Sequence, residues 1–297
     1  MNGEASEKLD RRALGRALSC AANASVRDIL ASSTTERGRQ ARRIGITGPP
    51  GAGKSTVISV LARYRLERAA RVAVIAIDPS SPKTHGSVLG DRIRMDGLID
   101  DSRVYIRSLA SRGASNGLAE NLPEILAVLD EFGFDEIILE TVGVGQSEFA
   151  IRDLVDVEVL VMTPGAGDQI QAMKAGIVET ADIYVINKSD QPGASRAEAE
   201  LRGILSIMAT GDLPPIVQLR ADAGENIDAL DRAIETCLER RGDASATARR
   251  RAFNRLHGLL LRRLHEAMDS LAPQELDRPV GALFEAVIAS LPVRKAD

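Results

Sequence analysis

Residues 44–55 have the sequence IGITGPPGAGKS, in which a short apolar run leads directly into a glycine-rich turn. From Gly48 to Ser55 the stretch matches the pattern G-x-x-x-x-G-K-[ST], and a helical run follows over residues 56–68. The pattern indicates a phosphate-binding loop when a strand precedes it and a helix follows it, and both conditions are met here. Glycines let the backbone curl until successive N–H groups point at phosphate oxygens, and the helix N-terminus adds partial positive charge.

Several residues of this loop have predicted tasks. Lys54 is expected to bridge the β- and γ-phosphates of a nucleotide, and the Ser55 hydroxyl is expected to ligate Mg²⁺. Dimerising ATPases of the partitioning type carry an additional lysine near the start of the loop, where this chain has Pro49, so that subclass is not expected. The residues predicted to contact the nucleotide here are Gly48, Gly51, Ala52, Gly53, Lys54, Ser55 and Thr56.

Around the loop, strand-length apolar runs alternate with amphipathic helical runs. The apolar runs are rich in Val and Ile, as strands buried on both faces should be. They lie at residues 44–47, 72–77, 104–106, 136–139, 157–162, 183–186 and 216–219. Strands alternating with helices imply an α/β fold with a doubly wound, mostly parallel sheet. Ligands bind beyond the carboxyl ends of such strands, so the polar residues that follow each run are candidates for the site.

Helical periodicity continues beyond the sheet pattern at both ends of the chain. We predict an N-terminal helical extension over residues 1–40, a nucleotide-binding domain over 41–242 and a C-terminal helical arm over 243–297. Near the N-terminus, Ser25 is a candidate helix cap. The arm carries several arginines and an apolar stripe, formed by Phe253, Leu256, Leu260, Leu264, Met268 and Leu271. Two interpretations stay open: a packing helix with a solvated charged face, or an arm that binds a second copy or another partner.

Composition excludes several classes of protein. The chain has 297 residues, 44% of them hydrophobic, and a formal charge of −4, so nucleic acid is not an expected partner. Cys20 and Cys237 are isolated thiols, which fits a reducing compartment and argues against a structural zinc site. No run approaches the ~18 apolar residues of a membrane span, and the first twelve residues contain no apolar segment. A cytoplasmic protein without a membrane anchor is expected.

Acidic residues stand at two strand ends beside the phosphate loop. Asp78 follows the run 72–77, and a carboxylate at that place suits Mg²⁺, directly or through water. Glu140-Thr141-Val142-Gly143 follows the run 136–139 and is similar to the D-x-x-G element of GTPases, with Glu in place of Asp. The Gly143 N–H is expected to sense the γ-phosphate. Glu140 is expected either to hold the metal shell or to orient the attacking water.

Asn187-Lys188-Ser189-Asp190 follows the run 183–186 and matches N-K-x-D, a pattern of guanine recognition. The Asp190 carboxylate can accept hydrogen bonds from guanine N1–H and the exocyclic amine, while Asn187 can reach the opposite edge. Adenine lacks this donor pair and would leave the carboxylate unsatisfied, and sites of this kind discriminate by ~10⁴-fold. We therefore predict GTP and GDP as the ligands.

These motifs resemble those of the methylmalonyl-CoA mutase-associated GTPases, the MeaB/ArgK family. The resemblance is dense from residue 44 to 190. Its most specific segments are DPSSP at 78–82, LGDRIRM at 89–95, IRSLASRG at 106–113, ETVGVGQSE at 140–148 and PGAGDQIQ at 164–171.

The resemblance implies a G-protein chaperone for an adenosylcobalamin-dependent acyl-CoA mutase. The family is similar in fold to the signal-recognition and nickel-insertion GTPases, and it forms homodimers through C-terminal helices. Asp78 and Asp91 would belong to a first switch, residues 140–148 to a second, and residues 164–174 to a third that faces the mutase. GTP hydrolysis would gate cofactor delivery and protect or reactivate the mutase.

This chain departs from the family pattern near the base. Where relatives often have Ser-Ala, it has Arg220-Ala221. The Ala221 N–H can still reach guanine O6, whereas the role of Arg220 is open. His85 and Asn116 replace common glycines, and a Trp that relatives often carry before residue 214 is absent.

The predicted mechanism combines electrostatics with positioning. Lys54, the loop amides and Mg²⁺ would neutralise the triphosphate, while Glu140 and Asp91 position water or metal. No arginine finger is assigned, although the candidates are Arg92, Arg94, Arg107 and Arg112. Small GTPases without such a finger turn over at ~10⁻⁴ s⁻¹, so we expect slow hydrolysis that the partner raises.

Two alternative functions remain open at this point. One is a transport-linked protein kinase, for which no acceptor or base is evident. The other is a nickel metallochaperone, although His85, His257 and His265 are scattered. No residue distinguishes one acyl-CoA mutase from another as the partner.

Overall fold

The computed structural model describes residues 9–32, 40–69, 71–79, 98, 101–111, 121–141, 151–165, 167, 181–208, 211–240 and 244–291. Among these residues, seven strands form one parallel sheet in the order β3-β2-β4-β1-β5-β6-β7. The strands are β1 (Arg42–Thr47), β2 (Val72–Pro79), β3 (Val104–Ser111), β4 (Glu136–Glu140), β5 (Val157–Met162), β6 (Ile183–Asn187) and β7 (Ile216–Leu219).

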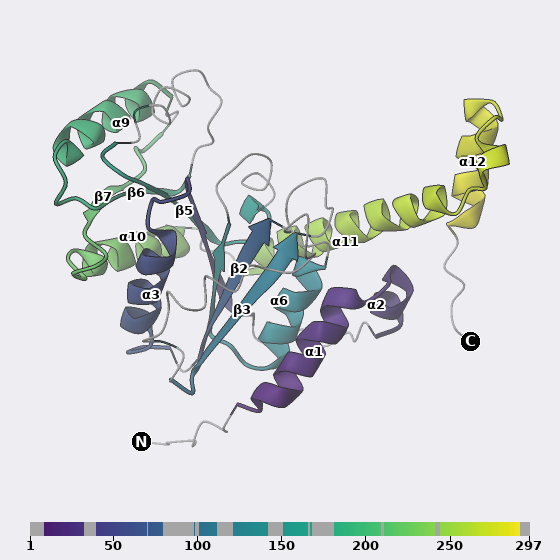
Figure 1. The fold of residues 1–297 in the computed structure, drawn as a ribbon, viewed down its shortest axis with the longest axis horizontal. Helices are drawn as coiled ribbons and strands as arrows, with labels where there is room; N and C mark the ends of the chain where they lie inside the picture. The colour runs from purple at the N-terminus through teal and green to yellow at the C-terminus, as the bar shows by residue number, and fades with distance from the viewer. Residues whose placement is uncertain are drawn as a thin grey trace.

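Helices cover both faces of the sheet (Figure 1). Alternate strand residues point to opposite faces, and the two sets pack on different helices. One face packs on α3 (Lys54–Arg65) and α10 (Ile227–Arg240). The other packs on α1 (Arg11–Asn23), α6 (Leu122–Glu131) and, beside β5 and β6, α9 (Ala194–Met208). The predicted doubly wound α/β fold is therefore confirmed.

All seven predicted strands are present, and five of them (β1, β2, β3, β4 and β6) extend beyond the apolar runs. β1 begins at Arg42 because Arg43 is buried there by an ion pair with Asp130 at 2.7 Å, which an apolar pattern cannot reveal. β4 continues through Glu140. β2 and β3 continue together, with Pro79 paired to Ser111.

The helical N-terminal extension is also present. In α2 (Val26–Ser32), the Asp28 N–H donates to the Ser25 hydroxyl at 3.2 Å, and the Ser25 N–H donates back to the Asp28 carboxylate at 3.1 Å. This capping box confirms Ser25 as the cap. The division at residues 40 and 242 stays a prediction.

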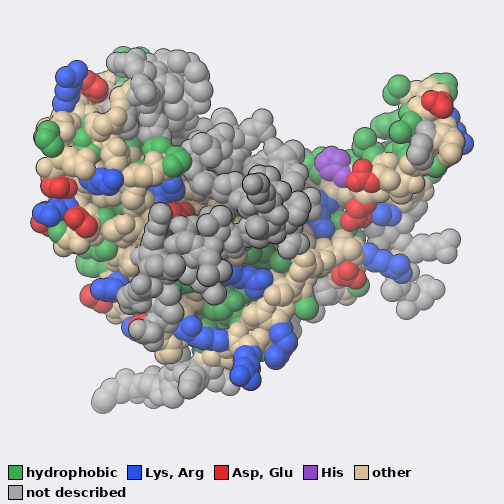
Figure 2. All heavy atoms as spheres, viewed as in Figure 1, with side chains coloured by type: hydrophobic (Ala, Val, Ile, Leu, Met, Phe, Trp, Pro, Cys, Tyr) green, Lys and Arg blue, Asp and Glu red, His purple; other side chains and the backbone are tan. Residues whose placement is uncertain are grey.

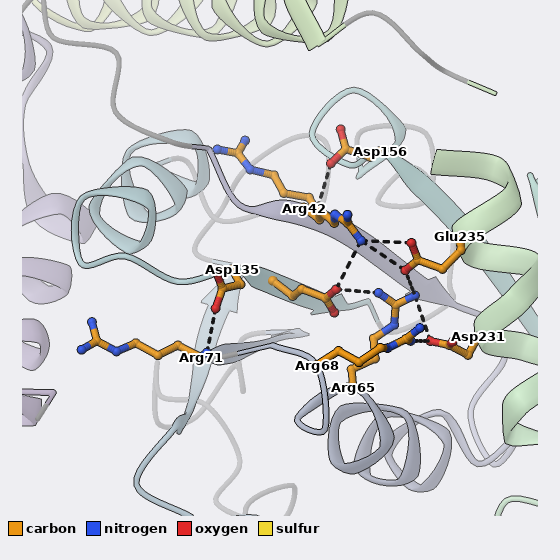
Figure 3. Close-up of polar contacts among 10 residues, drawn as sticks. Arg42, Arg65, Arg68, Arg71, Asp135, Asp156, Asp231 and Glu235 are labelled. Atoms are coloured by element: carbon orange, nitrogen blue, oxygen red, sulfur yellow. Dashed lines mark hydrogen bonds and ion pairs between the residues drawn. The ribbon is translucent and has the colours of Figure 1, made fainter. Parts of the chain in front are cut away.

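A buried ion network fixes the C-terminal end of α3, the helix that follows the phosphate loop (Figure 3). Arg65 is only 1% exposed and pairs with Glu136 at 2.6 Å, Glu235 at 2.9 Å and Asp231 at 3.2 Å. Arg42 also contacts Glu235, at 3.0 Å. The network joins α3 to β4, β1 and α10, so the phosphate-loop helix is anchored at the end remote from the loop.

The C-terminal arm consists of α11 (Ala244–Asp269), a 3₁₀ turn (Pro273–Glu275) and α12 (Val280–Ser290). It projects away from the sheet (Figure 1). Two of its arginines form ion pairs with residues around the sheet and do not face solvent as a charged surface: Arg251 pairs with Asp156 at 2.5 Å, and Arg255 pairs with Glu124.

The apolar stripe of α11 faces outward instead. Phe253 is 68% exposed and Leu260 is 56% exposed, and Val280, Phe284 and Ile288 on α12 are exposed as well. Hydrophobic side chains are visible on the arm in Figure 2. No helix in the described part of the chain is long and apolar enough to cross a membrane.

Candidate nucleotide-binding site

The predicted site residues lie at the carboxyl edge of the sheet. The phosphate loop follows β1, Glu140 ends β4 and Asn187 ends β6. β4 lies beside β1, with Ile46 paired to Glu140, and only β5 separates β1 from β6. The strand order therefore brings together three motifs that are far apart in the sequence.

The loop needs glycine at two positions for steric reasons. Gly48 has φ of 139°, and a Cβ there would lie 2.0 Å from the Val161 carbonyl oxygen. Gly53 has φ of 87°, and a Cβ there would lie 2.4 Å from Nδ2 of Asn187. Residues that have a side chain rarely adopt such φ values, and a Cβ atom does not approach another heavy atom this closely in real structures. The loop can therefore adopt this conformation only with glycine at both positions.

Lys54 places a positive charge inside this turn. Its ammonium donates to the carbonyl oxygens of Gly48 at 2.8 Å and Pro49 at 3.2 Å, and the side chain is buried. Lys54 is also the first residue of α3, whose N-terminus carries partial positive charge. A buried cation at that end of a helix repels the helix dipole, and an anion bound beside both would be stabilised by both. The loop therefore fits a phosphate chain.

Ser55 and Glu140 form a buried pair of oxygen-bearing side chains. The Ser55 hydroxyl donates to Oε1 of Glu140 at 2.9 Å. Hard cations such as Mg²⁺ take oxygen ligands, and Mg²⁺ is bound by one or two protein groups together with substrate phosphates. The described residues contain no group of three His, Cys, Asp or Glu that could hold a metal on its own. The pair fits a Mg²⁺ ion held jointly with a nucleotide.

The other predicted switch residues are placed only in part. Asp78 lies near the end of β2, which pairs with β4, but its side chain lies outside the described residues. Asp91 and Gly143 also lie outside the described residues. Thr56 is exposed in the first turn of α3.

Asn187 connects the phosphate loop to the loop after β7. Its Nδ2 donates to the Ala52 carbonyl at 2.8 Å, and its Oδ1 accepts from the Ala221 N–H at 3.2 Å. The side chain is only 3% exposed. Sequence analysis assigned Asn187 and Ala221 to the base, and missed that they bind each other. We call this pair of bonds, from Asn187 to Ala52 and to Ala221, the Asn187 bracket. No sequence signal indicated it, because Asn187 is 135 residues from Ala52 and 34 residues from Ala221.

Lys188 and Asp190 lie on the outer side of this bracket. Lys188 has φ of 57°, and its ammonium donates to the Gly51 carbonyl at 3.0 Å. The Ser189 N–H donates to the Leu219 carbonyl at 3.1 Å, which joins the ends of β6 and β7. Asp190 is half-exposed, with Nε of Arg220 at 3.9 Å from its Oδ1. The structure thus brings the predicted base-recognition residues against the predicted phosphate loop.

A glycine-rich loop between the first strand and helix of a parallel sheet, with a lysine inside it, defines a P-loop nucleotide-binding protein. The Asn187–Asp190 motif beside that loop is the arrangement expected of a GTPase. A sequence profile described as "Methylmalonyl Co-A mutase-associated GTPase MeaB" matches residues 13–271, and the chain belongs to this family.

Individual relatives agree with this assignment. A Pyrococcus abyssi protein named as a GTPase is 42% identical over 258 residues, which cover 84% of this chain and 79% of that protein. The mouse protein "Methylmalonic aciduria type A homolog, mitochondrial" is 41% identical over 191 residues, 62% of this chain and 46% of that protein. GTPase ArgK of Escherichia coli is 43% identical over 148 residues, 50% of this chain and 45% of that protein.

Solved structures support the fold. A crystal structure titled as an LAO/AO transport system kinase superposes with a TM-score of 0.68 at 25% identity, covering 97% of this chain and 91% of that one. HypB from Helicobacter pylori in complex with nickel superposes with a TM-score of 0.52 over 77% of this chain and 98% of that one. At 12% identity, the HypB likeness concerns the fold alone.

Proposed function

We propose that this chain binds Mg²⁺–GTP in the loop from Gly48 to Ser55, hydrolyses it, and thereby assists an adenosylcobalamin-dependent acyl-CoA mutase. The observation that carries the nucleotide part is the Asn187 bracket between Ala52 and Ala221. It joins the predicted phosphate and base loops into one continuous site. Family membership and the mouse relative support the mutase part.

The residues have distinct tasks in this proposal. Lys54 and the loop N–H groups neutralise the phosphates, and Mg²⁺, when bound, would add further positive charge. The Ser55 hydroxyl and the Asp78 carboxylate would hold the cation. Glu140 orients water or the metal shell together with Asp91, and the Gly143 N–H detects the γ-phosphate.

Guanine is selected by Asp190, whose two carboxylate oxygens accept from N1–H and the exocyclic amine. The Ala221 N–H lies on the neighbouring loop, after β7, and donates to Oδ1 of Asn187 at 3.2 Å. Guanine O6 would share or replace Oδ1 as the acceptor of this N–H. Lys188 packs along the phosphate loop and keeps the two motifs in contact.

Hydrolysis is proposed to be slow in the isolated protein. One arginine-finger candidate, Arg107, donates to Ser19 at 3.2 Å and to the Gly15 carbonyl at 3.4 Å, so α1 holds its guanidinium. Arg92, Arg94 and Arg112 lie outside the described residues. We expect a rate near ~10⁻⁴ s⁻¹ that rises when the mutase is added.

Calorimetry with Mg²⁺ tests the base assignment. Wild-type protein should bind GTP and GDP but not ATP. Asp190→Asn replaces an acceptor by a donor amide, so it should lose GTP affinity by about 100-fold or more and gain affinity for xanthosine triphosphate. Equal binding of ATP and GTP by the wild-type protein would overturn the proposal.

The mutase role needs a separate measurement. Phosphate release is followed with and without a reconstituted acyl-CoA mutase, and Lys54→Ala serves as the inactive control. Acceleration of at least tenfold is expected. Unchanged release with every adenosylcobalamin-dependent acyl-CoA mutase tested, combined with no co-sedimentation, would remove the partner from the proposal.

We also propose that the protein is a cytoplasmic homodimer that does not engage nucleic acid or membranes. The exposed apolar side chains of α11 and α12 support a partner surface on the arm. Neither Cys20 nor Cys237 forms a disulfide, which fits a reducing compartment.

A protein kinase is the second candidate, because the similar crystal structure carries a kinase title. γ-Labelled GTP separates the two: a GTPase releases labelled phosphate, whereas a kinase transfers the label to a protein. A nickel metallochaperone has less support, since its likeness rests on the fold alone and the described residues contain no cluster of three metal-ligating side chains.

A further inference from the structure

We propose that Arg220 is a positioning residue that orients the Asp190 carboxylate and thereby strengthens discrimination of guanine from hypoxanthine. The inference rests on the proposed GTP-binding function. It assigns a task to a residue whose role the sequence alone leaves open. Arg220 lies on the loop that follows β7, next to Ala221.

The guanidinium of Arg220 connects the two loops predicted to enclose the base. Its Nε lies 3.9 Å from Oδ1 of Asp190 and 3.3 Å from Oδ1 of Asp222. Its Nη1 donates to Oε1 of Glu225 at 3.5 Å. The Arg220 guanidinium therefore lies near carboxylates of both loops: Asp190 from the loop after β6, and Asp222 and Glu225 from the loop after β7.

The closing loop holds Arg220 in place. The Arg220 N–H donates to the Glu225 carbonyl at 3.3 Å, and the Glu225 N–H donates to the Arg220 carbonyl at 3.1 Å. The Gly224 N–H also donates to the Ala221 carbonyl, at 3.2 Å. These bonds fix the backbone of Arg220, and the contacts of its guanidinium with Asp222 and Glu225 keep the charge near Asp190.

The Arg220 Nε is buried and has no hydrogen-bond partner among the described residues, with Oδ1 of Asp222 at 3.3 Å and Oδ1 of Asp190 at 3.9 Å. Asp190 is 49% exposed, so its carboxylate is otherwise able to rotate into solvent. A fixed positive charge beside Oδ1 favours one orientation of the carboxylate. Guanine requires both oxygens to face its edge, whereas hypoxanthine lacks the exocyclic amine and requires only one.

The test compares Mg²⁺–GTP and Mg²⁺–ITP, the triphosphate of hypoxanthine, by calorimetry. Arg220→Gln removes the charge and keeps an N–H donor at about the position of Nε. We expect the ratio of GTP to ITP affinity to fall about three- to tenfold, since half-exposed ion pairs contribute modestly. Arg220→Lys should restore most of the ratio. Arg232→Gln, which removes an exposed pair with Asp228 on α10, should leave it unchanged.

A double-mutant cycle separates orientation from loop stability. In an Asp190→Asn background, Arg220→Gln should change xanthosine triphosphate affinity by less than about twofold, because the carboxylate is gone. A parallel loss of GTP and ITP affinity, or an equal loss in both backgrounds, would overturn the proposal. If the wild-type protein binds no GTP, the proposed function fails instead.

Discussion

The hydroxyl of Ser55 donates to Oε1 of Glu140 at 2.9 Å, across 85 positions of sequence. Ser55 belongs to the first turn of α3, and Glu140 is the last residue of β4. The pairing of β1 with β4 creates this contact, since Ile46 lies opposite Glu140. The bond links the predicted magnesium ligand to the segment expected to sense the γ-phosphate.

Ser55→Ala should therefore impair magnesium-dependent binding more than nucleotide binding itself. Loss of the hydroxyl removes one cation ligand and one partner of Glu140, and we expect the apparent Mg²⁺ affinity in the GTP complex to fall about 10- to 100-fold. Magnesium titrations of fluorescent-nucleotide binding measure the change. Ser59→Ala, on the same helix, is the control, and an identical Mg²⁺ dependence in the two variants would contradict the assignment.

Gly53→Ala and Gly51→Ala form a matched pair. Both glycines have positive φ, of 87° and 80°, but only at Gly53 would a Cβ meet Asn187, at 2.4 Å, while at Gly51 no atom lies within 4 Å. The backbone strain of about 1–2 kcal/mol should be common to both variants. Gly53→Ala should additionally displace Asn187 and abolish GDP binding, whereas Gly51→Ala should retain much of it. Equal losses of GDP affinity in calorimetry would show that backbone strain causes the loss and that the contact with Asn187 does not.

Asn187→Ala should weaken binding of GTP and GDP alike, because Asn187 connects the phosphate loop and the base loop through its bonds to Ala52 and Ala221. Removing the side chain takes away the hydrogen-bond partner it gives to the Ala221 N–H and to the Ala52 carbonyl. Each buried group left unsatisfied lowers the free energy of unfolding by about 1–3 kcal/mol. Chemical denaturation and GDP titration measure both effects. Asn254→Ala, which loses one bond to the Asp153 carbonyl at 3.1 Å, should cost less. Weaker GDP binding with an unchanged free energy of unfolding would contradict the supporting role and indicate base recognition alone.

Arg251→Met should destabilise the protein markedly. Burial lowers the pKa of the Arg251 guanidinium below its usual value, while Asp156 at 2.5 Å compensates the buried charge. Removing one partner of a buried pair typically costs about 3–5 kcal/mol. Arg196→Ala, which removes an exposed pair with Glu200 on α9, should change stability by about 0.5 kcal/mol or less. Equal free energies of unfolding for the two variants in urea would refute a stabilising role for the Arg251–Asp156 pair.

Replacing Phe253 and Leu260 by Ser should shift the protein from dimer to monomer. Both side chains are more than half exposed on α11, and we propose that a second copy of the chain buries them in the dimer. Sedimentation velocity measures the shift across concentrations. Ile207→Ser is the control, since Ile207 is 86% exposed on α9, outside the arm. A wild-type protein that stays monomeric at all concentrations would exclude the dimer.

Much of the fold was predictable because it follows from local patterns. The seven apolar runs became seven strands, since each is short and rich in apolar residues, and the inner strands β4, β5 and β6 are buried on both faces. The Ser25 cap was predictable because its partner, Asp28, lies three residues away. The start of β1 was not, because Arg42 and Arg43 look exposed in sequence and are accommodated by acidic partners from distant segments.

The sequence by itself determined the phosphate loop, the place of each motif at the carboxyl end of a strand and the GTPase class, because glycine conformation and residue periodicity act over a few positions. Only the tertiary structure decided that Asn187 brackets two loops, that Arg220 lies beside Asp190, and that α11 turns its arginines inward and its apolar side chains outward. These relationships depend on which distant charges meet when helices pack, and helical periodicity is the same whichever face is buried.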